Sequence, residues 1–266
     1  MDLDDFHGKE IVIYGAGHVG RKFFRTLQAH GIGDQVCCFA VTKPVKEECA
    51  EGLPIRCIDE IPVHKETLVC LAVHEALREE MEYYISRITK QYVWIYPYLY
   101  NFMFGQPERV NENIEIPVIL QNYGEDMRLA IRLAVIEQKF GKNLFGFEYY
   151  KKAQKIHCAE YTAGQRLGKF CRLIEDWEKE GYQKEHLLFL NQNYEMIDGN
   201  HRLSLAVYHK QKTIWCNIYP TKIPVEEIHG QGPKMSEGIL IRHGFTQDDI
   251  QKLKKIQERY LSFYET

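Results

Sequence analysis

Short apolar runs alternate with helical patterns along the first hundred residues. The first run, Ile11-Val-Ile-Tyr14, is rich in β-branched residues, and Gly15-Ala-Gly-His-Val-Gly20 and an amphipathic helix follow it directly. Similar runs recur at residues 36–41, 68–73 and 92–96. Strands that alternate with helices in this way form parallel sheets with helices on both faces. The pattern therefore predicts a doubly wound α/β domain over residues 1–105.

The chain is long enough for a second domain. It has 266 residues, of which 45% are hydrophobic and 27% are charged, so two compact cores can form. An amphipathic pattern from Glu125 to Phe140 predicts a connecting helix, within a helical connector at residues 106–154. A second, mixed α/β domain is then expected over residues 155–266. Its elements are predicted as a strand at 155–159, a helix at 166–180, strands at 187–190 and 194–197, a helix at 203–209, a strand at 213–219 and a helix at 250–264.

Charge and cysteine content limit the expected partners and compartment. The 34 basic and 37 acidic residues give a formal net charge of -3, so no overall positive field attracts nucleic acid. No segment has the length and hydropathy of a membrane span, and residues 1–10 do not resemble an export signal. The eight cysteines contain no CxxC pair, which favours reduced thiols in a cytoplasmic protein and no zinc site. We expect a small-molecule partner, with homo-oligomer formation left open.

The glycines Gly15, Gly17 and Gly20 form the first candidate site. A GxGxxG turn between a strand and a helix lets backbone N–H groups approach a phosphate, and cations in the first helical turn would be relieved by a bound anion. A dinucleotide site also needs an acidic residue about twenty positions further on to bind the ribose. The sequence there is Val41-Thr42-Lys43, so NAD is not expected. The alternative is that the glycines serve only to pack the helix against the sheet.

A resemblance to a known family covers this first region. The glycine turn, the runs at 11–14, 36–41 and 68–73, and the intervening segments Gly52-Leu-Pro-Ile55 and Ile58-Asp-Glu-Ile61 resemble the small Rossmann-like modules of bacterial surface-glycan biosynthesis proteins. In those proteins such a module often accompanies a catalytic domain. The resemblance implies that the chemistry of this chain lies downstream.

The pentapeptide Asp198-Gly-Asn-His-Arg202 forms the second candidate site. It ends an apolar run, turns at Gly199 and Asn200, and opens a helix with two cationic side chains. Cations at a helix start are favourable if a phosphate binds there, with Arg202 as a bidentate partner and His201 as a hydrogen-bonding partner. Asp198 could cap the helix, hold a magnesium ion or orient a substrate hydroxyl. The alternative is an ordinary helix cap with an exposed histidine and an ion-paired arginine.

The second region also resembles a known family. A helix, a strand pair and then Ile197-Asp-Gly-Asn-His-Arg-Leu203 with Ala206 are similar to the ParB/sulfiredoxin superfamily, over residues 155–220. Sulfiredoxins have a cysteine where this chain has Asn200, and the DNA-binding elements of partition proteins are not evident. The free-serine kinases of this superfamily carry Asp-Gly-His-His-Arg, which the chain matches except at Asn200.

The kinase-like resemblance implies a set of roles and cofactors. It implies ATP or ADP with magnesium as the cofactor, and a glutamate near the start of the domain as the base for a substrate hydroxyl. Glu160 is the acidic residue at the comparable place. Arg166, at the start of the following helix, is a candidate second phosphate contact, and the alternative is a solvated arginine at the helix end. The resulting catalytic set is Asp198, Glu160 and His201, and the cofactor-binding set adds Gly199, Asn200 and Arg202.

Three functional hypotheses follow from the two candidate sites. The favoured one is a nucleotide-binding, phosphotransferase-like protein that acts on a small hydroxyl compound in surface-polysaccharide biosynthesis. The second is a module that senses a nucleotide or a nucleotide-sugar without catalysis. The third, based on the glycine turn alone, is an NAD-linked sugar oxidoreductase or epimerase, against which the missing ribose-binding acid counts.

Overall fold

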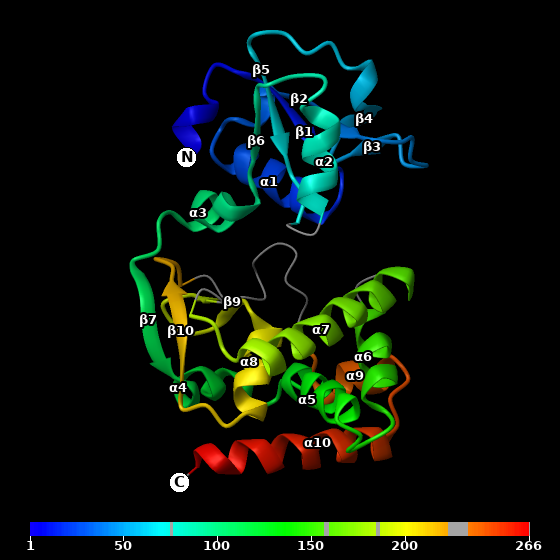
Figure 1. The fold of residues 1–266 in the computed structure, drawn as a ribbon, viewed down its shortest axis with the longest axis vertical. Coiled ribbons are helices and arrows are strands. Elements are labelled where there is room, and N and C mark those ends of the chain that lie inside the picture. The colour runs from blue at the N-terminus through cyan, green and yellow to red at the C-terminus, as the bar shows by residue number, and fades with distance from the viewer. Residues whose placement is uncertain (75–76, 157–159, 185–186, 223–233, 266) are drawn as a thin grey trace. The chain divides into compact units, whose positions relative to one another are not determined.

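The computed structural model describes residues 1–74, 77–156, 160–184, 187–222 and 234–265 (Figure 1). The chain divides into two compact units, Met1–Gln106 and Pro107–Thr266, here called unit 1 and unit 2. Both contain helices and strands, so the predicted α/β class is observed. Within the described part of the chain, no helix combines the length and the hydropathy needed to cross a bilayer.

Unit 1 is built on a six-stranded sheet with the order β3-β4-β2-β1-β5-β6. Five of its strands run parallel, and the short strand β3 at one edge is antiparallel to β4. The strands are β1 (Glu10–Tyr14), β2 (Val36–Val41), β3 (Cys49–Ala50), β4 (Leu53–Cys57), β5 (Thr67–Leu71) and β6 (Tyr92–Trp94). The helices are α1 (His18–Ala29), α2 (Arg78–Ile85) and α3 (Leu99–Phe104).

The sheet of unit 1 separates two hydrophobic cores. Successive side chains of a strand point to opposite faces, so Ile11 and Ile13 of β1 join one core, while Val12 and Tyr14 join the other. All four side chains are buried. This burial on both faces explains why β1 reads as a continuous apolar run in the sequence.

Unit 2 contains a four-stranded mixed sheet with the order β7-β10-β8-β9. Its central strand pair, β10 and β8, is parallel, and the outer pairs are antiparallel. The strands are β7 (Arg109–Glu115), β8 (Leu188–Leu190), β9 (Met196–Asp198) and β10 (Thr213–Ile218). The helices are α4 (Ile116–Leu120), α5 (Arg128–Lys139), α6 (Gly146–Gln154), α7 (Glu160–Glu180), α8 (Asn200–Tyr208), α9 (Glu237–Arg242) and α10 (Gln247–Leu261).

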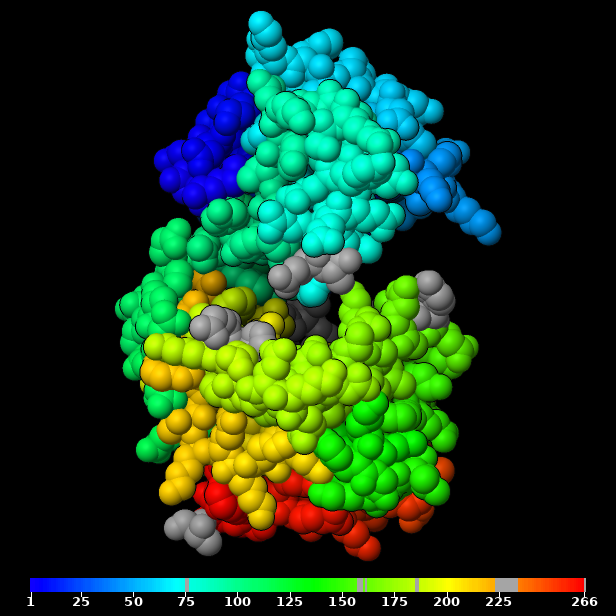
Figure 2. Space-filling view, in the orientation of Figure 1, coloured from blue at the N-terminus to red at the C-terminus, as the bar shows by residue number. Residues whose placement is uncertain are grey.

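Helix α5 lies in the middle of the unit 2 core. Every residue from Leu129 to Glu137 is buried, including Arg132 and Glu137, and α6, α8 and α10 contribute to the same core. Helix α7 forms much of the visible face of unit 2, where it is drawn in yellow-green (Figure 2). Residues 106–154, expected as a connector, thus supply one strand of the unit 2 sheet and the helix at the centre of its core.

Candidate anion-binding site

The turn between β9 and α8 requires glycine at position 199. Strand β9 ends at Asp198, and Gly199 has a φ of 112°, which L side chains rarely adopt. A Cβ atom at this position would lie 2.5 Å from Cδ2 of Leu188. Helix α8 then begins at Asn200, so Asn200, His201 and Arg202 form its first turn, three residues earlier than the apolar pattern indicated.

Asp198 does not cap the helix. Its Oδ1 accepts a hydrogen bond from the N–H of the adjacent Gly199 at 2.8 Å, and Gly199 itself occupies the N-cap position. The capping role considered for Asp198 is therefore wrong. The carboxylate lies partly exposed at the end of its strand, immediately before the first turn of α8. It is the acidic side chain of this turn.

His201 is a neutral side chain in an aromatic pocket. Its Nε2 shares a hydrogen bond of 2.7 Å with the hydroxyl of Tyr150, and its ring centroid lies 4.4 Å from that of Phe170. Burial lowers the pKa of His201 well below 6.5, and the positive charges of nearby arginines lower it further. At neutral pH the ring therefore offers a hydrogen bond without adding a charge. The alternative of an exposed histidine does not hold.

Three arginines act electrostatically on His201, and they come from three different helices. These are Arg132 of α5, Arg166 of α7 and Arg202 of α8. Within the described residues none of the three pairs with a carboxylate. Three positive charges therefore act on a neutral histidine, and the charge of Asp126, which is itself paired with Arg128, offsets that of Arg132 only from a distance. Such an arrangement is suited to bind an anion of several charges.

Arg132 is the most buried of the three, with 9% of its surface exposed. Its Nη1 donates to the carbonyl oxygen of Arg128 at 2.9 Å, but its buried Nε has no hydrogen-bond partner among the described residues. Burial lowers the pKa of the Arg132 guanidinium. A buried guanidinium N–H without a partner is costly, and an anionic ligand would satisfy it.

Among the described residues, the hydrogen-bond partners of Arg166 and Arg202 are neutral. Arg166 Nη1 donates to Oε1 of Gln154 at 2.8 Å, and Arg202 Nη1 donates to the carbonyl oxygen of Leu187 at 2.7 Å. The ion-paired state considered for Arg202 is therefore not observed. These hydrogen bonds fix one nitrogen of each guanidinium and leave further N–H donors, since a guanidinium carries five.

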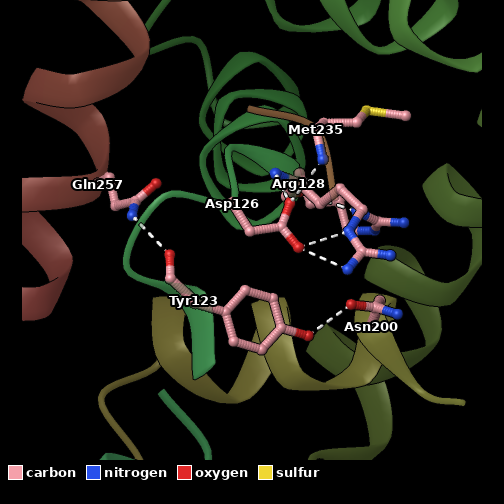
Figure 3. A network of polar contacts seen from close by, with 7 residues as sticks. Tyr123, Asp126, Arg128, Asn200, Met235 and Gln257 are labelled. Carbon is pink, nitrogen blue, oxygen red and sulfur yellow. Dashed lines mark hydrogen bonds and ion pairs between the residues drawn. The ribbon is translucent and has the colours of Figure 1, made fainter. Parts of the chain in front are cut away.

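A network of buried polar groups includes Asn200, the first residue of α8 (Figure 3). The hydroxyl of Tyr123 donates to Oδ1 of Asn200 at 2.5 Å, which fixes the amide at the start of α8. Close by, Asp126 is 1% exposed at its side chain and pairs with Arg128, whose Nη2 lies 2.5 Å from Oδ2. Asp126 also accepts a hydrogen bond from the N–H of Met235. Asp126 is thus ion-paired with Arg128, and it acts on Arg132 only through its charge.

Glu160 does not lie where the predicted strand would have placed it. It is the first residue of α7, its side chain is 79% exposed, and its Oε1 lies 2.8 Å from Nζ of Lys155. The hydrogen bond from Lys155 lowers the pKa of the Glu160 carboxyl, which weakens it as a base. Residues 155 and 156 follow α6 instead of forming a strand, and residues 157–159 lie outside the described part.

The glycine turn of unit 1 is largely explained by packing. Gly15 has a φ of 126°, and a Cβ there would lie 2.6 Å from the carbonyl oxygen of Ala72. A Cβ at Gly20 would lie 1.9 Å from the carbonyl oxygen of Gly15. Only Gly17, the N-cap of α1, would place a Cβ in open space. Two of the three glycines are therefore needed by the fold itself.

The polar groups around the unit 1 turn are already paired. Arg21, in the first turn of α1, forms an ion pair of 2.5 Å with Glu47 and donates through Nε to the carbonyl oxygen of Ala16. At the end of β2, where a ribose-binding acid is needed, the hydroxyl of Thr42 shares a hydrogen bond of 2.7 Å with that of Tyr14. The case for a bound phosphate is thus weaker here than at α8.

Sequence reasoning missed three residues of the site, namely Arg132, Tyr150 and Tyr123. The sequence did contain a signal for Arg132. This residue lies one helical turn after Arg128 in the segment Arg-Leu-Ala-Ile-Arg-Leu-Ala-Val-Ile, and all the other residues of this segment are apolar, so the helix has no polar face. An arginine in a fully buried helix needs a partner or a ligand. The two tyrosines carry no such signal, since tyrosine is common in cores.

The described residues contain no group of three or more histidine, cysteine, aspartate or glutamate side chains that could hold a metal ion. Magnesium retains several waters and binds through one or two carboxylates together with phosphate oxygens, so Asp198 could serve as such a ligand. In comparisons with known proteins, no family model, no curated protein and no solved structure matches this chain.

Proposed function

We propose that the chain is a nucleotide-binding, phosphotransferase-like protein, and that unit 2 binds the phosphates of ATP or ADP at the first turn of α8. The observation that carries the proposal is the convergence of Arg132, Arg166 and Arg202 without a carboxylate partner among the described residues. A diphosphate or triphosphate supplies several negative charges in one compact group. It therefore balances this cluster better than a single carboxylate does.

Each residue of the site has a role in this proposal. Arg202 and Arg166 bind the outer phosphoryl oxygens, and the buried Nε of Arg132 donates to an inner one. His201, kept neutral, donates a ring N–H to the same group, and Tyr150 fixes its orientation. Asp198 orients the hydroxyl that accepts the phosphoryl group, in place of Glu160. Magnesium, when bound by Asp198 and the phosphates, would neutralise part of the phosphate charge.

The finer fold assignment is part of the same proposal. The parallel strand order β4-β2-β1-β5-β6, with the glycine turn after β1, supports a Rossmann-like unit 1. The sequence of α7, the β8 and β9 pair, the Asp198-Gly-Asn-His-Arg202 turn and α8 supports a ParB-like unit 2. The Rossmann-like resemblance of unit 1 is the basis for proposing a role in surface-glycan biosynthesis, where the acceptor would be a small hydroxyl compound.

Isothermal titration with ATP, ADP and CTP tests the proposed site. Arg202→Ala should weaken binding of the preferred nucleotide by about tenfold or more, because charge-assisted hydrogen bonds to a phosphate are lost. Arg172→Ala is the matched control, because Arg172 is an exposed arginine on α7, the helix that also carries Arg166. Its affinity should change by less than about twofold. No binding to the wild-type protein, or equal loss in both variants, would remove the proposal.

A second candidate function is nucleotide sensing without turnover. It is favoured by the position of Glu160, which is exposed and paired with Lys155 and is therefore a poor general base. Transfer would then depend on Asp198 alone. Phosphorus NMR of the protein with bound ATP and a panel of small hydroxyl compounds separates the two functions. Formation of ADP and a new phosphate ester supports transfer, whereas tight binding with unchanged ATP supports sensing.

A further inference from the structure

A groove on unit 2 is lined by residues other than those of the α8 turn. It has a volume of about 610 Å³ and is formed by the segment after Tyr123, the start of α9 and one face of α10. Its lining combines carboxylates with the apolar side chains of Met127 and Leu261. Nothing in the proposed phosphotransferase chemistry uses it.

The groove carries an excess of negative charge. Glu125, Glu258 and Glu265 line it, and within the described residues none of them has an ion pair or a hydrogen bond through its side chain. The lining cation is Lys254, which is neutralised by Glu237 at 2.6 Å. Three carboxylates therefore remain to attract a positively charged ligand.

A buried amide on the same groove lacks a partner. Gln257 lines the groove with 8% of its surface exposed, and its Oε1 has no hydrogen-bond donor among the described residues. Its Nε2 is turned toward the carbonyl oxygen of Tyr123, at 3.5 Å, which leaves Oε1 on the opposite branch of the amide (Figure 3). A buried acceptor of this kind is stabilised when a ligand brings an N–H group.

The composition of the lining indicates which kind of cation fits. No three acidic, histidine or cysteine side chains of the described chain are placed to share one metal ion. The groove is lined instead by separate carboxylates together with apolar side chains. We propose that this groove binds a linear organic polyamine, with ammonium groups on the three unpaired glutamates and on Oε1 of Gln257, and with methylene groups on Met127 and Leu261.

Titration calorimetry with spermidine, whose amines are protonated at neutral pH, tests this proposal. The double variant Glu125→Gln with Glu258→Gln should weaken binding by about tenfold, and Gln257→Leu should weaken it severalfold through loss of the acceptor. Glu79→Gln with Glu80→Gln is the matched control, because it removes two exposed carboxylates from α2 in unit 1. That control should change the affinity by less than about twofold.

Two further measurements distinguish loss of spermidine binding from a folding defect and from a change at the nucleotide site. Gln257→Leu should unfold at the same temperature as the wild-type protein or higher, since it removes an unpaired buried oxygen. Arg202→Ala should bind spermidine as the wild-type protein does, so failure at one site leaves the other testable. Absence of saturable binding, equal weakening by the α2 control, or displacement of spermidine by equimolar magnesium would overturn the proposal.

Discussion

Arg132 carries a positive charge in the interior of unit 2, and among the described residues no carboxylate forms an ion pair with it. Replacing it by methionine keeps an apolar stem of similar length and removes the buried charge. We expect Arg132→Met to raise the free energy of unfolding by about 1–3 kcal/mol, because the unpaired charge costs more than its hydrogen bond to Arg128 contributes. The same variant should lose nucleotide binding. Urea unfolding and titration calorimetry measure the two effects.

The neighbouring Arg128 provides the contrast for this experiment. It is paired with Asp126, whose side chain is 1% exposed, so Arg128→Met leaves a buried carboxylate without its partner. Such a change should lower the free energy of unfolding by about 3–5 kcal/mol. If Arg132→Met destabilises the protein as strongly as Arg128→Met does, Arg132 is a structural residue and the anion site is wrong.

His201 gives the stability of the protein a pH dependence with a defined sign. Its pKa in the folded state lies well below 6.5, so below that pH the unfolded chain takes up a proton that the folded chain does not. The stabilisation linked to neutral His201 is complete above pH 6.5 and is lost as the pH falls toward its folded pKa. The loss has a slope of up to about 1.4 kcal/mol per pH unit.

The variant His201→Gln isolates this effect. It keeps a hydrogen-bonding group near Tyr150 and does not titrate. Urea unfolding between pH 5 and pH 8 should show a smaller fall in stability at acidic pH for the variant than for the wild-type protein. Parallel curves would mean that folding does not lower the pKa of His201, which contradicts its burial as a neutral ring.

At the scale of elements, the sequence predicted the helices and strands that have a strong apolar pattern. The apolar runs at 36–41 and 213–219 correspond closely to β2 and β10, because the residues of a buried central strand are apolar throughout or at every second position. Strand β7 was missed because it is an edge strand in which only Ile114 is buried, so it has no periodic signal.

The anion site could not be assembled from sequence, because its arginines come from α5, α7 and α8 and meet only through packing.

The turn between β1 and α1 allows a test of packing against ligand binding. Gly20→Ala should lower the free energy of unfolding by about 1–3 kcal/mol or more, because its Cβ collides with the Gly15 carbonyl. Gly17→Ser should be neutral or slightly stabilising, since Gly17 has extended backbone at the N-cap and open space around it. Thermal unfolding compares the two, and equal destabilisation would contradict the packing assignment.

At the scale of the whole molecule, local charge balance decides where an anion binds. The chain has a net charge of -3, so its overall field does not attract nucleotides. In unit 1 the cation Arg21 is neutralised by Glu47, whereas the three arginines around His201 in unit 2 have no such partner among the described residues. Both turns place glycine ahead of a histidine and an arginine, but among the described residues the arginine of the first turn has an ion pair and the arginines around the second have none.

Hydrogen exchange with ADP distinguishes the two turns in the intact protein. Bound phosphates should slow exchange at the start of α8 and in α5, because the ligand joins the first turn of one helix to Arg132 of the other. Residues 15–21 should exchange as in the free protein, and NADH should protect neither region. Protection of residues 15–21 by ADP or NADH would place the nucleotide in unit 1. In that case the open space at Gly17 would be a ligand contact, and the arginines of unit 2 would need another anion.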